Sequence, residues 1–308
     1  MGNASQVLVP NPESVDPLLG TSLGHFTIQE RLPGGSMGRV YRAWDIRLRR
    51  TVALKVIRTD LASDPVAWGR ILREARIASR LNHPNICAVY DVGENSDQAY
   101  IAMEYVKGSP LTGAVRPNGL PIDKAIRLAI QIAEGLVHAH AEKIIHRDIK
   151  SNNVLVTPNW QAKILDFGLA QRIKTRNDAK VTSSYLSLEI GGPLAGNLFY
   201  LAPEILHGKV PNIQSDLWAL GILLYEMLTG KFPFAGRTFF ETSFLIMASP
   251  PPPRPRSVPA SLSRVVERCL EKDRRNRYKS AHQIVQDLRR LQQSNLPFTR
   301  SQHEGKRV

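Results

Sequence analysis

The spacing of apolar positions changes between the two parts of the chain. Up to residue 105 the apolar residues form short runs bounded by Gly, Pro and Asn, a pattern typical of β-strands. These runs are Phe26–Ile28, the two halves of Arg31–Tyr41, Thr51–Ile57, Cys87–Val92 and Tyr100–Tyr105. One segment, Trp68–Leu81, instead repeats apolar residues at helical spacing. The pattern therefore predicts a β-rich first part with a single amphipathic helix.

Beyond residue 105 helical spacing dominates. Ile122–Ala141 carries a continuous apolar stripe, and we expect it to form a long buried helix. Further helices are predicted at Gln214–Thr229, Val265–Leu270 and Ala281–Leu291. Two short apolar runs, Ile144–Ile145 and Val154–Val156, are predicted to be buried strands that bracket a polar loop.

Four segments show neither pattern. Residues 1–24 are rich in Pro, Asn and Ser and are expected to be a flexible arm, and residues 293–308 a polar tail. The polar stretch Gln171–Gly196 is long for a loop inside a compact domain, and such loops are commonly functional. Pro250–Pro253 could serve as a ligand for a proline-binding domain, but we interpret it as a linker between helices.

Composition narrows the class of partner. The chain has 308 residues, enough for two modest lobes or one large domain. Its net charge of +14 is compatible with nucleic acid, anionic lipid or acidic substrates. The basic residues are scattered, however, and no basic tract is interleaved with aromatic residues as in single-strand binding proteins. We therefore expect no nucleic-acid partner, and we interpret the charge as a phosphate site plus a solvated surface.

Cysteine usage and hydropathy favour a cytoplasmic protein without a membrane partner. Cys87 and Cys269 have apolar neighbours and no Cys-x-x-Cys pattern, so we expect buried thiols rather than a zinc site or a disulfide. No apolar run approaches the ~18 residues of a membrane span. Met1–Gly20 lacks the basic start and apolar core of a secretory signal. Gly2 invites N-myristoylation, but Gln6 stands where that motif has Ser or Thr.

The loop between the two short apolar runs concentrates polar side chains. It contains the segment His146–Asn153, and a second short run further on ends at Asp166. Burying such groups without partners is costly. Two carboxylates and an amide at the ends of short strands suit a divalent cation and a phosphate. The alternative is a solvated turn held by a few ion pairs.

Two features of the first part point to the same chemistry. Lys55 lies in an otherwise apolar strand, where a buried lysine must pair with an anion. Glu74 lies beside the apolar stripe of the predicted helix and is the expected partner, although it could instead pair with Arg70 or Arg73 at the surface. The turn at 34–38 contains three glycines, which would let the backbone approach a ligand closely.

The order and spacing of these features match the protein-kinase signature. From about His25 to about Leu291 the chain resembles the eukaryotic-like Ser/Thr protein kinases of bacteria. The resemblance implies an α+β, two-lobed protein-kinase fold within residues 25–292. The small lobe, about 25–106, would be mainly antiparallel β-sheet with one key helix. The larger lobe, about 107–292, would be mainly α-helical.

The resemblance further implies an ATP-dependent serine/threonine protein kinase that transfers the γ-phosphate to protein hydroxyls. Asp148 would accept or orient the proton of the substrate hydroxyl, and Lys150 would stabilise the transferred phosphate. Lys55 would bind the α- and β-phosphates, oriented by Glu74. The Asp-x-Lys-x-x-Asn spacing that starts at Asp148 resembles Ser/Thr kinases more than tyrosine kinases.

The nucleotide site implied by the resemblance draws on both lobes. Its expected residues are Leu32, Gly34, Gly35, Gly38, Val40, Ala53, Lys55, Glu74, Met103, Glu104, Val106 and Leu155. Asn153 and Asp166 would hold Mg²⁺ through hard oxygen ligands, and Mn²⁺ is also possible. Other residues would be structural: a Glu204–Arg277 ion pair, a catalytic loop braced by Asp216 and Trp218, and His146 packed against Phe167.

The chain departs from the family pattern at three places. Pro33 stands where the first glycine of the phosphate loop is usual, and Asn197 where a threonine usually contacts the catalytic Asp and Lys. The segment from Asp166 to Glu204 is also long for the family. Two other functions stay open: a pseudokinase scaffold, and a small-molecule phosphotransferase of related fold. The complete set of catalytic polar residues argues against the first, and the Ala202-Pro203-Glu204 motif against the second.

Arg147, directly before Asp148, suggests activation by phosphorylation, because a phosphate in the long polar segment could pair with it. We hypothesise autophosphorylation at Thr182, Ser183 or Ser184. The expected partners are protein substrates with Ser or Thr acceptors, and the chain is expected to be a monomer or a transient homodimer.

Overall fold

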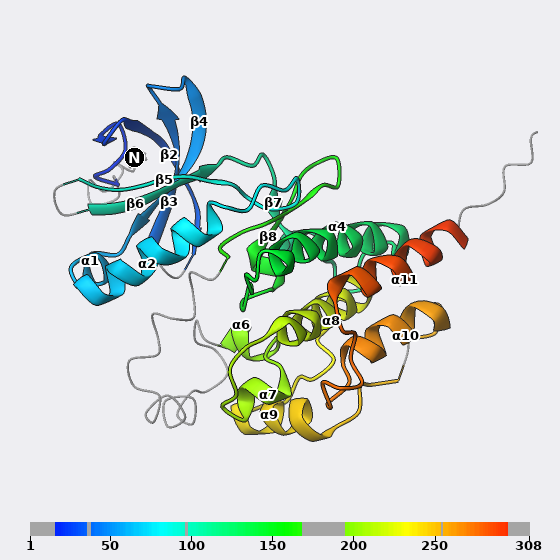
Figure 1. Cartoon of the computed structure of the whole chain (residues 1–308). Coiled ribbons are helices and arrows are strands. Elements are labelled where there is room, and N and C mark those ends of the chain that lie inside the picture. Colours follow the sequence, from blue (N-terminus) through cyan, green and yellow to red (C-terminus); the bar gives the residue numbers. More distant parts are fainter. Residues whose placement is uncertain (1–15, 36–37, 96–97, 168–194, 254, 295–308) are drawn as a thin grey trace, which may run out of the picture. The chain divides into compact units, whose positions relative to one another are not determined.

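A computed structural model of the chain is shown in Figure 1 and describes residues 16–35, 38–95, 98–167, 195–253 and 255–294. The chain divides into two compact units. The first consists of residues up to Leu72 together with Val89–Tyr105, and the second of Arg73–Ala88 together with the residues from Val106 onward. Each unit is described by itself.

The first unit is built on a six-stranded antiparallel sheet with the strand order β1-β2-β3-β4-β6-β5. Its strands are β1 (Ser22–Leu23), β2 (Phe26–Gly35), β3 (Gly38–Asp45), β4 (Arg50–Ile57), β5 (Val89–Asn95) and β6 (Gln98–Glu104). Side chains alternate between the two faces, and Phe26, Tyr41 and Leu54 are among the buried residues that form its core. The predicted β-rich part is confirmed, with β5 displaced toward the C-terminus from the predicted run at 87–92.

The sheet begins earlier than the sequence pattern predicts. β1 lies within the segment expected to be a flexible arm, and Leu23 is buried. Gly20 N donates to Ile28 O at 3.0 Å, and Ile28 N donates to Thr21 O at 2.9 Å. Ser22 and Leu23 therefore belong to the sheet, and the turn before them is tied to β2 through Gly20 and Thr21. Residues 1–15 of the predicted arm lie outside the described residues.

Helix α1 (Thr59–Ala62) is short, and α2 (Pro65–Ala78) follows it and runs from the first unit into the second. The helical stripe predicted at 68–81 is confirmed as α2, with its core at the fully buried Ile71 and Ala75. The helix ends three residues earlier than expected, although Leu81 is still buried.

The second unit is mainly helical. Its helices are α3 (Leu111–Ala114), α4 (Ile122–Ala141), α6 (Ala195–Leu198), α7 (Pro203–Leu206), α8 (Ile213–Thr229), α9 (Phe239–Ala248), α10 (Ala260–Cys269) and α11 (Ala281–Ser294). The apolar α8 lies at the centre and packs against α4 and α10, while α11 packs on α4. Asn212 and Ser215 form a capping box at the start of α8, and Gly230 ends it with φ at 69°.

A three-stranded sheet and a 3₁₀ turn hold the polar loop. The strands are β7 (Ser109–Pro110), β8 (Val154–Val156) and β9 (Ala162–Ile164), and the turn η2 is Ser151–Asn153. The strand predicted at Val154–Val156 is confirmed. The strand predicted at Ile144–Ile145 is wrong, because Ile144 N donates to Ala139 O at the end of α4 and both residues are only half-buried.

A proline-rich segment completes the second unit. The prolines of 250–253 lie between α9 and α10 outside any helix or strand, which agrees with a linker. Within the described ranges, no helix combines the length and the apolar composition that a membrane crossing requires.

Candidate active site

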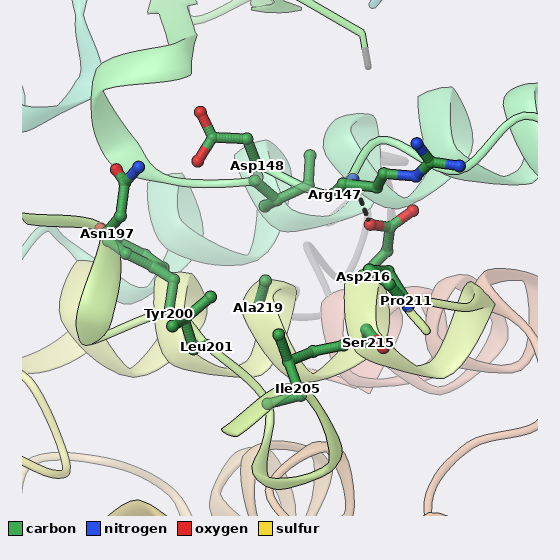
Figure 2. Close-up of a pocket in the computed structure, with 12 residues that line it drawn as sticks. Arg147, Asp148, Asn197, Tyr200, Leu201, Ile205, Pro211, Ser215, Asp216 and Ala219 are labelled. Atoms are coloured by element: carbon green, nitrogen blue, oxygen red, sulfur yellow. Dashed lines mark hydrogen bonds between the residues drawn. The ribbon is translucent and has the colours of Figure 1, made fainter. Parts of the chain in front are cut away.

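The predicted catalytic loop contains residues 146–153, and its backbone is fixed by Asp216, in the first turn of α8. Its Oδ1 accepts a hydrogen bond from Arg147 N at 2.8 Å, which Figure 2 shows as a dashed line. Its Oδ2 accepts from His146 N at 2.9 Å and from His140 Nε2 at 2.8 Å. Asp216 is almost fully buried, and the three donors satisfy both of its oxygens. These bonds stabilise Arg147 with φ at 70°, a left-handed conformation that is strained for a residue other than glycine.

Asp148, Lys150 and Asn153 form one hydrogen-bonded group. Asp148 Oδ2 accepts from Lys150 Nζ at 2.8 Å and from Asn153 Nδ2 at 2.8 Å. Asn153 Nδ2 also donates to the backbone oxygen of Asp148 at 2.8 Å. Among the described residues, none donates to Asp148 Oδ1, and 12% of this side chain is exposed. The carboxylate is therefore oriented through one oxygen and has the other available as an acceptor.

Asn197, which replaces the usual threonine, reaches the same group. Lys150 Nζ donates to Asn197 Oδ1 at 2.6 Å, in addition to its bond to Asp148. Asn197 therefore offers the Lys150 ammonium an acceptor at the position where the family usually has threonine. Figure 2 shows Asp148 and Asn197 beside a pocket whose apolar lining includes Leu201, Ile205 and Ala219.

The two predicted metal ligands lie on linked backbone segments. Leu165 N, next to Asp166, donates to Asn153 O at 2.8 Å. Because the nitrogen of the Asn153 amide is committed to Asp148, its oxygen is the atom that could face a cation. Asp166 has φ at 55°, a left-handed conformation that requires support from its neighbours. The described residues include no cluster of three or more His, Cys, Asp or Glu suited to a metal. An amide oxygen and a carboxylate fit Mg²⁺, which commonly takes its other ligands from water and phosphate.

His146 supports this turn, as the sequence predicts. Its Nε2 donates to Leu165 O at 2.8 Å, its Nδ1 accepts from Asp148 N at 3.2 Å, and its ring meets Phe167 edge-on at 4.5 Å. Burial lowers the pKa of His146 and outweighs the opposing effect of the nearby Asp216. The residue is therefore a neutral bridge between the two aspartate-bearing turns rather than a catalytic base.

A buried network behind the loop is absent from the sequence predictions. Ser151 Oγ donates to Glu226 Oε1 at 3.0 Å, Tyr200 OH donates to Glu226 Oε2, and Ser151 N donates to Tyr200 OH at 3.2 Å. Burial raises the pKa of Glu226, although the hydrogen bonds from Tyr200 and Ser151 oppose this shift. Glu226 in the otherwise apolar segment 217–228 was the available signal, but its partners are 26 and 75 residues away in sequence.

The predicted ion pair between Glu204 and Arg277 is confirmed. Arg277 donates from Nη1 and Nη2 to the two carboxylate oxygens, both at 2.8 Å, and its guanidinium is fully buried. Burial alone would raise the pKa of Glu204, but the hydrogen bonds from Arg277 outweigh it, and the pKa is lowered. Trp218, expected to brace the catalytic loop, instead stacks on Phe234 at 5.7 Å and lies 4.9 Å from the Arg277 guanidinium.

In the first unit, strand register places the expected nucleotide residues on one face. Val40 pairs with both Leu32 and Lys55 across the neighbouring strands, and Ala53 pairs with Met103. Ala53 and Lys55 are two residues apart on β4, so the five side chains share a face of the sheet. The alternation places Glu104, which pairs with Val52, on the opposite face.

At the end of the glycine-rich turn, the close approach of β3 to β4 requires glycine at position 38. A Cβ on Gly38 would lie 2.0 Å from the backbone oxygen of Val56, so only glycine allows β3 to approach β4 this closely. Gly34 and Gly35 end β2, whose pairing with β3 is irregular between Leu32 and Gly35.

The remaining predicted residues lie in the second unit. Glu74 is buried on α2, Val106 is the first residue after the unit boundary, and Leu155 lies in β8. Because Lys55 belongs to the first unit and Glu74 to the second, their pairing stays a prediction. The hypothesised phosphorylation sites Thr182, Ser183 and Ser184 lie outside the described residues.

Comparison with known proteins shows the family to which the chain belongs. The protein kinase domain family model matches residues 26–288, and the chain belongs to this family. It is 36% identical over 270 residues to the serine/threonine-protein kinase PrkC of Bacillus subtilis, an alignment that covers 86% of the chain and 40% of PrkC.

Two further bacterial relatives have similar identity. The chain is 36% identical over 273 residues to the serine/threonine-protein kinase PknA of Mycobacterium tuberculosis, covering 86% of the chain and 61% of PknA. It is 38% identical over 282 residues to the serine/threonine-protein kinase PknB of Mycolicibacterium smegmatis, covering 88% of the chain and 44% of PknB. The chain thus spans between 40% and 61% of the length of these relatives.

Proposed function

We propose that the chain is an ATP-dependent kinase that phosphorylates serine and threonine hydroxyls of proteins. The observation that carries this proposal is the convergence of Lys150 and Asn153 on one oxygen of Asp148, with Asn197 as a second acceptor for Lys150. The relatives, which are named as serine/threonine-protein kinases, support the choice of acceptor.

In the proposed reaction the acceptor oxygen attacks the γ-phosphorus while the bond to the β–γ bridging oxygen breaks and ADP leaves. Asp148 orients the hydroxyl and takes its proton, for which Oδ1 is the oxygen without a donor among the described residues. Lys150 neutralises charge on the phosphoryl oxygens during transfer. Such catalysis depends on positioning and electrostatics, and the hydrogen bonds of the loop supply both before substrate binds.

Asn153 and Asp166 would hold the divalent cation. When bound, Mg²⁺ would neutralise charge on the ATP phosphates. The oxygen of the Asn153 amide and the Asp166 carboxylate are hard ligands that suit this ion, and Mn²⁺ suits the same donors.

Strand register in the first unit supports some of the proposed nucleotide contacts. Leu32, Val40, Ala53 and Met103 offer apolar surface for the adenine, and Lys55 on the same face offers a cation for the phosphates. Family resemblance assigns Gly34, Gly35, Gly38, Glu74, Glu104, Val106 and Leu155 to the same nucleotide.

The proposal extends to regulation and location. Arg147 Nε is buried and has no hydrogen-bond partner within the described ranges, which supports Arg147 as the receiver of an activating phosphate. We propose autophosphorylation in the 171–196 segment, and mass spectrometry of protein incubated with ATP and Mg²⁺ tests this. An unmodified segment in fully active protein would contradict it. A cytoplasmic location is also proposed, supported by the burial of the Cys87 and Cys269 thiols, which are not joined in a disulfide.

Transfer of labelled phosphate from ATP to a generic basic protein tests the function directly. Wild type should label the substrate, and Asp148→Asn should not. Asp123→Asn is a matched control, because Asp123 lies in the first turn of α4 and its side chain is 73% exposed. Equal labelling by wild type and Asp148→Asn would refute the proposal, and ATP binding without turnover in wild type would favour a scaffold.

A further inference from the structure

Asp16, outside the residues matched by the family model, makes a compact set of contacts with the sheet. Its Oδ2 accepts from Tyr41 OH at 2.9 Å and lies 3.6 Å from Arg31 Nη1. Its Oδ1 accepts from Leu18 N at 3.2 Å and lies 3.5 Å from Arg39 Nη1. Both carboxylate oxygens are therefore engaged, each by one hydrogen bond and one arginine.

The contacts of Asp16 fall at the base of the glycine-rich hairpin. Arg31 on β2 pairs directly with Tyr41 on β3, and Arg39 lies two residues from Tyr41 on the same face. The next pair toward the turn is Leu32 with Val40, whose side chains lie on the opposite face, where the nucleotide is proposed. Asp16 thus contacts both strands of the hairpin from the face opposite the proposed adenine contacts.

The pairing of β2 with β3 is irregular near the turn of this hairpin. The regular pairing of β2 with β3 is interrupted between Leu32 and Gly35, directly beyond the strand positions that Asp16 bridges. The pairing resumes at Gly35 with Gly38, so the register of the two strands shifts within this interval. The bridge from Asp16 joins Arg31, Tyr41 and Arg39 beside this shift and so restrains the two strands where they approach the turn.

Burial makes the bridge stronger than an ordinary surface ion pair. The Asp16 side chain is only 7% exposed, whereas Arg31 and Arg39 are 58% and 52% exposed. Exposed pairs contribute little, but a buried carboxylate needs its donors. Burial alone would raise the pKa of Asp16, but the hydrogen bonds from Tyr41 and Leu18 N, together with the charges of the two arginines, outweigh it and lower the pKa.

We propose that Asp16 is a positioning residue that restrains the glycine-rich hairpin and thereby strengthens ATP binding. This inference rests on the proposed kinase function. It predicts a defect in nucleotide affinity rather than in the chemical step, because Asp16 touches neither the catalytic loop nor the proposed metal ligands in the contacts above.

Asp16→Asn tests the proposal, because asparagine keeps the shape and the acceptor for Tyr41 but removes the charge. We expect the KM for ATP to rise about three- to tenfold with kcat within about twofold of wild type, the change that loss of one charge-assisted contact produces. Glu30→Gln is the matched control, because Glu30 pairs with Arg42 at 3.0 Å across the same two strands but is 57% exposed. Its KM for ATP should stay at the wild-type value.

Tyr41→Phe provides a second variant that keeps the buried ring and removes the donor. Its effect on the KM for ATP should be non-additive with that of Asp16→Asn, because both changes disturb one bridge. A KM in Asp16→Asn equal to that of Glu30→Gln would overturn the inference, and so would kcat falling in parallel with the thermal midpoint. If wild type transfers no phosphate at all, it is the proposed function that fails.

Discussion

Asp148 lies in the loop at 146–153 and Asp216 supports that loop from α8, yet different numbers of their carboxylate oxygens accept hydrogen bonds. Asp216 accepts three hydrogen bonds over both oxygens and is 1% exposed. Asp148 accepts two side-chain hydrogen bonds on Oδ2, and its side chain is 12% exposed. Glu204, paired through both oxygens with Arg277, resembles Asp216 in this respect.

The difference supports the proposal that Asp216 is a supporting carboxylate and Asp148 a reactive one. A buried acceptor whose oxygens are both occupied stabilises the fold and has no capacity for a substrate. A carboxylate oriented through one oxygen can accept a hydroxyl proton on the other. The number of carboxylate oxygens that already accept hydrogen bonds, rather than residue type, therefore supports the role proposed for each aspartate.

The largest effect is expected for Asp148→Asn. Turnover of phosphate transfer should fall about 10³-fold or more, because the proposed base is lost, while the free energy of unfolding stays within about 1 kcal/mol of wild type. Steady-state kinetics and urea unfolding of the same preparation measure the two quantities. A loss of activity matched by a loss of stability would place Asp148 in the same class as Asp216.

Asp216→Asn should lower the free energy of unfolding markedly, whereas Asp148→Asn should leave it nearly unchanged. Asparagine cannot accept all three hydrogen bonds without placing a donor against a donor, so the free energy of unfolding should fall by about 2–4 kcal/mol. Urea unfolding with Asp123→Asn as control measures this change. An unchanged stability would mean that the loop is supported elsewhere.

Two buried glutamates extend the comparison to pH. The pKa of Glu204 is lowered, so its stabilising contribution is present above the ordinary value of 4.5 and is lost as pH falls through the folded-state pKa. The pKa of Glu226 is raised, so its contribution is full below 4.5 and is lost as pH rises through the folded-state pKa. The direction of each pKa shift identifies the protonation state that the folded protein stabilises. This is the carboxylate for Glu204 and the neutral carboxyl for Glu226.

Thermal unfolding between pH 4 and pH 8 should therefore separate Glu204→Gln from Glu226→Gln. At neutral pH the first variant should be less stable than wild type, by about 1–3 kcal/mol, and the second at least as stable. Both differences should diminish toward pH 4. Parallel behaviour of the two variants across this range would contradict the assignment of opposite signs.

The smallest effect is expected for Asn197→Thr. Because Asn197 already offers an acceptor to Lys150 at 2.6 Å, the family residue should change kcat/KM for a protein substrate by less than about tenfold. Initial rates at varied substrate concentration measure this. A gain far above tenfold would show that asparagine impairs the site.

The sequence predicted those site features that family spacing encodes. Asp216 under the loop, His146 against Phe167 and the Glu204–Arg277 pair are all confirmed. Each prediction came from a motif whose members keep fixed positions along the chain, so contacts between distant residues could be named in advance.

The features that were missed depend on contacts that no local pattern encodes. β1 forms because β2 offers an edge, and the Ser151–Glu226 bond joins residues 75 positions apart. Helix α9 is apolar on most sides and exposes Phe240 and Phe244, so it lacks the amphipathic stripe that marks a helix. The strand predicted at Ile144–Ile145 does not form, because two apolar residues in a row do not by themselves supply a neighbouring strand with which to pair.

The most direct test of the account is the identity of the labelled amino acid in the product. Protein substrate labelled from γ-labelled ATP with Mg²⁺ is hydrolysed in acid, and the phosphoamino acids are separated. We predict label in phosphoserine and phosphothreonine with wild type, and none with Asp148→Asn. Label in phosphotyrosine, or equal label with both proteins, would contradict the assignment of this chain as a serine/threonine kinase with Asp148 as its base.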